Sequence, residues 1–86
     1  MRDLAFTPTA SDQYDYWSLN DKKIHDRIVE LIKATVEEPF KGIGKPEPLK
    51  HQYKGYWSRR INKEHRLVYE VTNDTIIIVS CRFHYY

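Results

Sequence analysis

The sequence has few of the residues that build cross-links, metal frameworks or membrane spans. Its 86 residues include one cysteine, Cys81, and three glycines. A single cysteine excludes an intramolecular disulfide and favours a reducing compartment, and no cysteine–histidine metal framework can be drawn. The longest apolar runs, such as residues 76–79, are far too short to cross a membrane. Residues 1–8 lack the apolar run of a signal peptide, so we expect a soluble cytoplasmic protein without metal or other cofactors.

Charge is distributed unevenly along the chain. Residues 1–40 contain five Lys or Arg against eight Asp or Glu, a net charge of −3, whereas residues 41–86 contain nine against four, a net charge of +5. The length suits one small domain spanning residues 1–86. The basic half points to an anionic partner, although a solvated basic surface would explain the charge alone equally well.

The first forty residues predict a short strand followed by two helices. We expect the strand over residues 2–6 and a helix start at Thr7-Pro8, where a hydroxyl cap precedes proline at the first helical position. The second helix is capped by Asn20 or Asp21 and stops before Pro39. So short a connection predicts an antiparallel helical hairpin. The expected buried positions are Ala10, Tyr14 and Trp17, then Ile24, Ile28, Leu31 and Ile32.

The second half of the chain predicts a loop and then strands. Residues 40–54 have the composition of a loop. Three strand-like runs follow at 56–61, 65–72 and 76–86, separated by two three-residue turns that suit tight hairpins. This order predicts an α+β fold, in which an N-terminal strand and a helical hairpin pack on one face of a mainly antiparallel β-sheet with a C-terminal three-stranded meander.

The turn length in the second hairpin decides which side chains share a face. A three-residue turn pairs Leu67 with Cys81, Tyr69 with Val79, and Val71 with Ile77, so every pair is apolar. A two-residue turn would set Leu67 against Ser80 and mix the two faces. We therefore predict the three-residue turn.

The same register places cations together on the face away from the helices. Arg66 lies opposite Arg82, Arg60 lies opposite Arg66 across the first hairpin, and His84 is one diagonal step away. Like charges directly opposite one another are destabilising in a sheet, so this group invites an anion. Phosphate is the natural candidate because arginine binds it in a bidentate manner. His84 can also hold or give a proton near neutral pH.

Glu47 is a carboxylate on a stiff, extended segment, because prolines at 46 and 48 restrict the backbone around it. Metal-free cleavage of RNA needs a base for the 2′-hydroxyl, cations for the phosphorane and an acid for the leaving 5′-oxygen. DNA should resist such a reaction, because it has no 2′-hydroxyl. The residues that could fill these roles are Glu47, Lys50, Arg60, Arg66, His84 and Tyr85.

Other titratable residues have simpler interpretations. Arg59 has the opposite strand parity to Arg60 and is interpreted as a packing or rim residue. His51 and His65 are interpreted as loop or turn histidines, and Cys81 as a small core residue without raised reactivity.

Four segments carry a family resemblance: GKPEPLK at 44–50, GYWSRRI at 55–61, EHRLVY at 64–69 and CRFHY at 81–85. Together they resemble the YoeB/Txe toxins of the RelE superfamily, from bacterial toxin–antitoxin systems. The resemblance covers almost the whole chain. It implies a RelE-like, microbial-RNase-like fold and a ribosome-dependent endoribonuclease that cuts mRNA in the ribosomal A site and halts translation.

The resemblance also implies residue roles and partners. The partners would be the ribosome with its mRNA, a neutralising antitoxin of the YefM/Phd type, a second copy of the chain, and operator DNA only through the antitoxin complex. The implied roles are general base for Glu47, general acid for His84, transition-state stabilisation for Arg66, and supporting positions at Lys50, Arg60 and Tyr85.

Two alternatives to cleavage stay open. The chain could dock on RNA or the ribosome through its basic face without cutting, in which case salt-sensitive binding would survive Glu47→Gln. It could also be an inactive toxin that acts only as a partner in a repressor complex with the antitoxin. A rigid acid beside arginines favours cleavage, since a pure binder does not need one.

Overall fold

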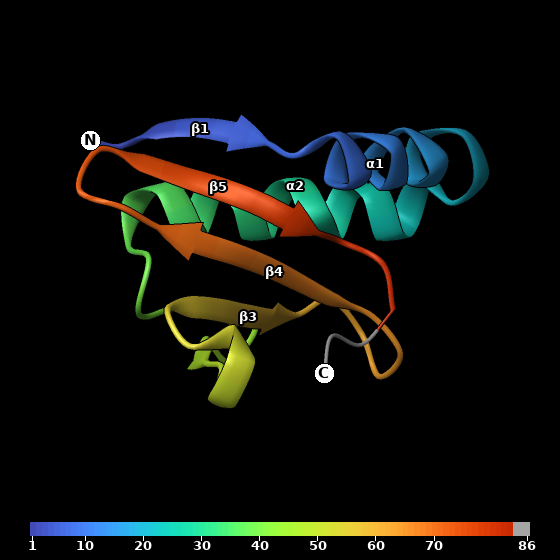
Figure 1. Ribbon diagram of the computed structural model, residues 1–86. Coiled ribbons are helices and arrows are strands. Elements are labelled where there is room, and N and C mark those ends of the chain that lie inside the picture. Colours follow the sequence, from blue (N-terminus) through green and yellow to red (C-terminus); the bar gives the residue numbers. More distant parts are fainter. Residues whose placement is uncertain (84–86) are drawn as a thin grey trace.

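The computed structural model describes residues 1–83. Figure 1 shows the two helices gathered on one side of a twisted sheet. The elements in chain order are β1 (Asp3–Phe6), α1 (Pro8–Asn20), α2 (Lys22–Glu37), β2 (Glu47–Pro48), the short 3₁₀ helix η1 (His51–Tyr53), β3 (Tyr56–Arg60), β4 (Arg66–Val71) and β5 (Thr75–Ser80).

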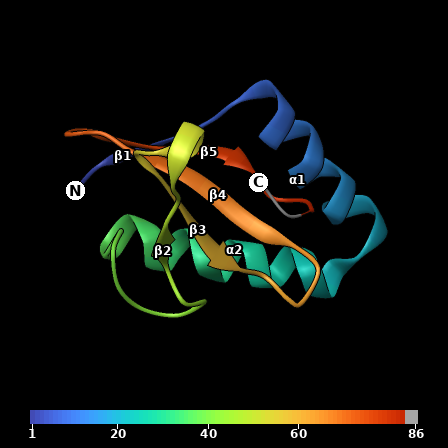
Figure 2. The ribbon, with the colours of Figure 1, turned by 60° about the horizontal axis from the view of Figure 1, so that its bottom comes forward.

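The five strands form one sheet in the order β1-β5-β4-β3-β2. β1 runs parallel to β5, and every other neighbouring pair is antiparallel. Figure 2 shows β2 and β3 at the edge of the sheet away from β1, with α2 behind them. The predicted α+β fold is therefore confirmed.

The helix boundaries follow from local capping. The Thr7 hydroxyl accepts a hydrogen bond from the Ala10 backbone N–H at 3.1 Å, and proline occupies the first helical position of α1. Asp21 ends α1 by donating its N–H to Trp17 O, and it caps α2 by accepting from the Ile24 N–H at 3.2 Å. Because a single residue joins the helices, they lie side by side as the predicted hairpin.

Two predicted segments differ in extent from the structure. The expected loop over residues 40–54 contains β2 and η1, so the stiff segment at Glu47 is an edge strand rather than a free loop. The last strand was expected to continue to Tyr86, but β5 ends at Ser80. Residues 84–86 lie outside the described part of the chain.

The β4–β5 register also differs from the prediction. The Thr72 N–H donates to Thr75 O at 2.9 Å, so the turn has two residues, Asn73 and Asp74, rather than three. The predicted pairs of Tyr69 with Val79 and of Val71 with Ile77 are wrong. The observed pairs next to the turn are Val71 with Ile76, Glu70 with Ile77, and Tyr69 with Ile78.

A β-bulge reconciles this short turn with an apolar inner face. Tyr69 pairs with Ile78, but Val68 pairs with Ser80, so Val79 is an extra residue in β5. An inserted residue shifts the parity of the strand by one. A two-residue turn alone would mix polar and apolar residues on each face, but the extra residue in β5 restores the apolar inner face. Tyr69, Ile78 and Cys81 are accordingly all fully buried.

The core lies between the sheet and the helices. Ile28 and Leu31 of α2 are fully buried against β4 and β5, as the apolar stripe predicted. The Trp17 indole N–H donates to Cys81 O at 2.9 Å and ties α1 to the segment after β5. Within residues 1–83, no helix has the length and apolar character needed to cross a membrane.

Candidate active site

Glu47 is positioned by pairing between β2 and β3. It lies opposite Ser58, and the Leu49 N–H donates to Tyr56 O at 2.8 Å. Proline on either side suits an edge strand, because an edge position does not need every N–H for the ladder. The carboxylate is exposed to solvent. The backbone therefore presents a fixed acid at the rim of the sheet.

The segment before β2 is anchored at Gly44. The Arg60 N–H donates to Gly44 O at 2.6 Å. Gly44 has φ of +81°, and a Cβ there would lie 2.7 Å from Leu31 Cδ2. Only glycine satisfies both the backbone conformation and the close approach to α2. Glu47 is thus held from both sides, by Gly44 before it and by β3 beside it.

Arg60 and Arg66 lie directly opposite each other, as predicted. Residues two apart in a strand share a face, so Arg60 is on the same face as Ser58 and its partner Glu47. Glu47 and Arg60 are therefore diagonal neighbours, a relation that places Cα atoms roughly 7–8 Å apart. Glutamate and arginine side chains are long enough to span that separation. The register therefore places one acid and two arginines on the same face of the sheet.

Arg66 is held in place by the turn that precedes β4. Its Nη1 donates to Asn62 O at 2.9 Å and to His65 O at 3.3 Å. The Arg66 backbone N–H donates to Phe83 O at 3.1 Å, which keeps the segment after β5 next to β4. Arg66 is half-buried as a residue, and these bonds position its guanidinium before any ligand binds.

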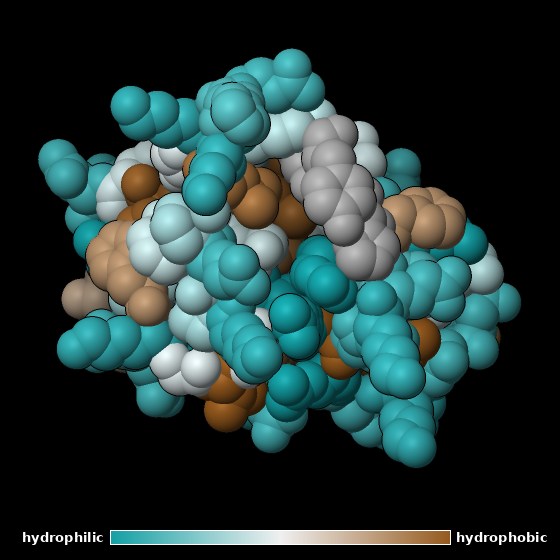
Figure 3. All heavy atoms as spheres, turned by 90° about the horizontal axis from the view of Figure 1, so that it is seen from below, coloured by the Kyte–Doolittle hydropathy of each residue, from teal (hydrophilic) through white to brown (hydrophobic). Residues whose placement is uncertain are grey.

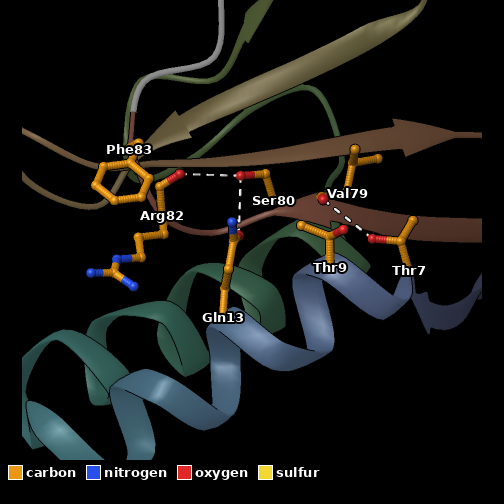
Figure 4. A pocket seen from close by; sticks show the side chains of 7 residues that line it. All are labelled: Thr7, Thr9, Gln13, Val79, Ser80, Arg82 and Phe83. Carbon is orange, nitrogen blue, oxygen red and sulfur yellow. Dashed lines mark hydrogen bonds between the residues drawn. The ribbon is translucent and has the colours of Figure 1, made fainter.

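Arg82 does not join this group, contrary to the prediction. Its guanidinium carbon lies 3.8 Å from the centre of the Tyr16 ring on α1 and 4.7 Å from that of Phe83. Figure 4 shows the side chain pointing away from Thr7 and Thr9. β5 has already ended at Ser80, so strand parity no longer governs the side chain, and stacking on an aromatic face is favourable for arginine. Arg82 is a packing residue here.

His65 has a role that the sequence did not reveal. It is 5% exposed, its ring lies 4.8 Å from that of Trp17, and its Nδ1 accepts a hydrogen bond from the Phe83 N–H at 2.7 Å. The predicted turn position is correct, but His65 also anchors residue 83, which directly precedes His84. No local pattern signals a contact between residues 18 positions apart. The predicted site residues His84 and Tyr85 themselves lie outside the described residues.

Arg59 is a buried residue, as its interpretation as a packing residue suggested. It has no exposed surface, and its guanidinium donates to the Tyr69 hydroxyl and to three backbone carbonyls, those of Ile43, Glu38 and Lys41. Burial raises the pKa of Tyr69, partly offset by the hydrogen bond and the charge of Arg59. Arg59 therefore ties β3 to the segment that leads from α2 to β2.

The other candidate residues have plain surroundings. Lys50 is exposed immediately before η1, beyond the end of β2. Cys81 is fully buried, and burial raises the pKa of its thiol to about 12. The thiol is neutral at physiological pH, which agrees with its interpretation as an unreactive core residue.

The chain is similar in structure and sequence to known proteins. A YoeB dimer from Staphylococcus aureus superposes with a TM-score of 0.90 at 48% identity, covering 98% of each chain. A heterotetrameric YoeB–YefM toxin–antitoxin complex from the same organism gives a TM-score of 0.89 at 48% identity, covering 99% of each chain. Toxin YoeB of Escherichia coli (strain K12) is 55% identical over 82 residues, which cover 95% of this chain and 98% of that protein.

The fold is that of a small toxin of the RelE superfamily. A family model described as the YoeB-like toxin of bacterial type II toxin–antitoxin systems matches residues 6–85. The chain belongs to this family of YoeB-like toxins.

Proposed function

We propose that this toxin is a ribosome-dependent endoribonuclease that cleaves mRNA in the ribosomal A site and thereby inhibits translation. The observation that supports this best is the placement of Glu47 on the same sheet face as the opposed pair of Arg60 and Arg66. Two guanidinium groups suit a phosphate, and the carboxylate beside them suits removal of a proton from an adjacent hydroxyl.

In the proposed reaction Glu47 takes the proton of the ribose 2′-hydroxyl. The 2′-oxygen attacks the neighbouring phosphorus, and the bond from phosphorus to the 5′-oxygen breaks, leaving a 2′,3′-cyclic phosphate. Arg66 and Arg60 stabilise the charge that develops on the phosphorane. His84 gives its proton to the departing 5′-oxygen. Lys50 and Tyr85 support binding of the RNA.

Cleavage during in vitro translation tests the proposal. New 5′ ends should map within the A-site codon of a defined mRNA. Glu47→Gln and His84→Gln should each slow cleavage by roughly 10²–10⁴, and Arg66→Ala by a similar factor. Glu37→Gln, which removes an exposed carboxylate at the C-terminal end of α2, is the matched control and should cleave at the wild-type rate. Translation arrest with intact message would instead identify a non-cleaving RNA or ribosome binder.

We also propose two protein partners for this toxin. The relatives from Staphylococcus aureus form a YoeB dimer and a YoeB–YefM heterotetramer. This chain should likewise form a homodimer and bind an antitoxin of the YefM type, through which alone it contacts operator DNA. Its site of action is the cytoplasm, where mRNA is translated. Co-expression with an antitoxin encoded next to it should relieve toxicity and yield a complex on size-exclusion chromatography.

A further inference from the structure

A second basic feature borders the proposed catalytic face, where the β3–β4 turn approaches α2. Arg60 and Arg66 line an open pocket of about 410 Å³. β3 and this turn lie at the bottom of Figure 1, and the surface seen from below consists largely of hydrophilic side chains. The other residues that line the pocket, none of which takes part in the proposed reaction, are Arg27 on α2 and Ile61, Asn62 and Lys63 at the end of β3 and in the turn.

The polar side chains that line this pocket offer donors and positive charge. Arg27, Lys63 and the two strand arginines have no acceptor atoms. The Asn62 side-chain oxygen already accepts from the N–H groups of Glu64 at 2.9 Å and His65 at 2.8 Å, which leaves the amide nitrogen for a ligand. Among residues 1–83, no carboxylate lines the pocket. Its chemistry therefore selects an anion.

Two of the guanidinium groups are held before a ligand arrives. Arg66 Nη1 is fixed by the carbonyls of the turn, and Arg27 Nη1 bonds Glu30 Oε1 at 2.8 Å across one turn of α2. Arg60 and Arg66 face each other across the strands, an unfavourable placement that a bound anion relieves. Glu30 neutralises Arg27 only in part, because the pair is exposed to solvent.

We propose that this pocket binds a backbone phosphate of the mRNA strand next to the phosphate that is cleaved. Arg60 and Arg66 belong both to the catalytic face and to the pocket, so one continuous strand can occupy both. A water molecule in the liquid occupies about 30 Å³, so a pocket of about 410 Å³ has room for many water-sized groups. It is therefore large enough for a phosphate with part of its ribose. The identity of the strand rests on the proposed nuclease function. Arg27 and Lys63 then act in substrate binding and not in the chemical step.

The test measures RNA binding without cleavage, so that it does not depend on nuclease activity. The probe is a short single-stranded RNA carrying 2′-O-methyl groups, titrated against the full chain at several salt concentrations. The slope of log K against log salt for single strands is about −0.7 per phosphate contact. Arg27→Ala should weaken binding about tenfold and make the slope shallower by about 0.7, and Lys63→Ala should act in the same direction.

Matched variants separate this pocket from general charge effects. Lys33→Ala removes a cation from the same helix outside the pocket and should leave the salt slope unchanged. Arg27→Lys keeps the charge and should retain most of the slope. In translation reactions, Arg27→Ala should raise KM with little change in kcat. Glu47→Gln should instead lower kcat with little change in KM.

Three results would overturn the proposal. The first is no RNA binding by the wild-type chain, and the second is equal salt slopes for Arg27→Ala and Lys33→Ala. The third is a change in the salt slope of Arg27→Ala that is seen with ribosomes lacking mRNA but not with the short RNA. The last result would assign the phosphate to ribosomal RNA. If the short RNA binds as expected but no mRNA is cleaved during translation, the pocket stands and the proposed nuclease function fails.

Discussion

Arg59→Met removes a guanidinium group that has no exposed surface and donates to four acceptors. The acceptors lie in β4 and in the segment that leads from α2 to Glu47. Methionine retains most of the aliphatic volume but cannot donate hydrogen bonds. The substitution therefore separates the polar contacts of Arg59 from its packing.

The expected loss of unfolding free energy is about 3–5 kcal/mol. Hydrogen bonds from a charged donor contribute about 1.5–3 kcal/mol each, which sets an upper limit for the four together. Two effects reduce that limit. Water can reach the carbonyls of Glu38, Lys41 and Ile43, because these bonds are only partly buried. Burying the guanidinium also carries a desolvation penalty of several kcal/mol, which the variant no longer has.

Urea unfolding followed by tryptophan fluorescence measures this loss. The chain should have an unfolding free energy of roughly 4–13 kcal/mol, so the variant should lose a large part of its stability. The urea midpoint should fall while the slope with denaturant stays constant. Arg59→Lys keeps the charge but not the planar fork, and its stability should lie between those of the wild type and Arg59→Met.

Arg60→Met is the matched control, because Arg60 is the next residue of β3 and is exposed on the opposite face. Its stability should differ from that of the wild type by no more than about 0.5 kcal/mol. If Arg59→Met stays within about 1 kcal/mol of the wild type, the four hydrogen bonds do not hold the segment before β2 and the reasoning is refuted.

Three further predictions follow from single contacts. His65→Leu keeps the packing but removes the acceptor for the Phe83 N–H, so A-site cleavage should fall while a melting curve shows a folded chain. Burial raises the pKa of the Cys81 thiol from 9.0 to about 12; its stabilising contribution is therefore complete below pH 9 and lost as the pH rises towards 12. Urea unfolding from pH 8 to 11 should show a shallower decline for Cys81→Ala. Thr7→Ala removes the cap on Ala10 N and should cost about 1–2 kcal/mol by the same assay, a loss that Thr7→Ser largely restores.

Local signals in the sequence determined much of this fold. The starts of the two helices follow from Thr7, which precedes Pro8, and from Asp21. The side chains of Thr7 and Asp21 each accept a hydrogen bond from the N–H three residues later. The first hairpin is equally local, so the opposition of Arg60 and Arg66 could be predicted from turn length and parity. Both depend on residues close in the chain, where spacing alone defines geometry.

Tertiary structure decided the parts that depend on distant contacts. A parity argument that assumes ideal strands cannot predict the bulge at Val79. β5 also ends at Ser80, so Arg82 is not part of the strand and does not pair with Arg66 in the ladder. Arg82 then stacks on Tyr16, far away in the sequence. The same holds for Glu47, whose edge strand forms only because β3 folds beside it. The sequence by itself determined which residues could do chemistry, whereas packing between remote segments decided which of them meet, because no local pattern encodes those contacts.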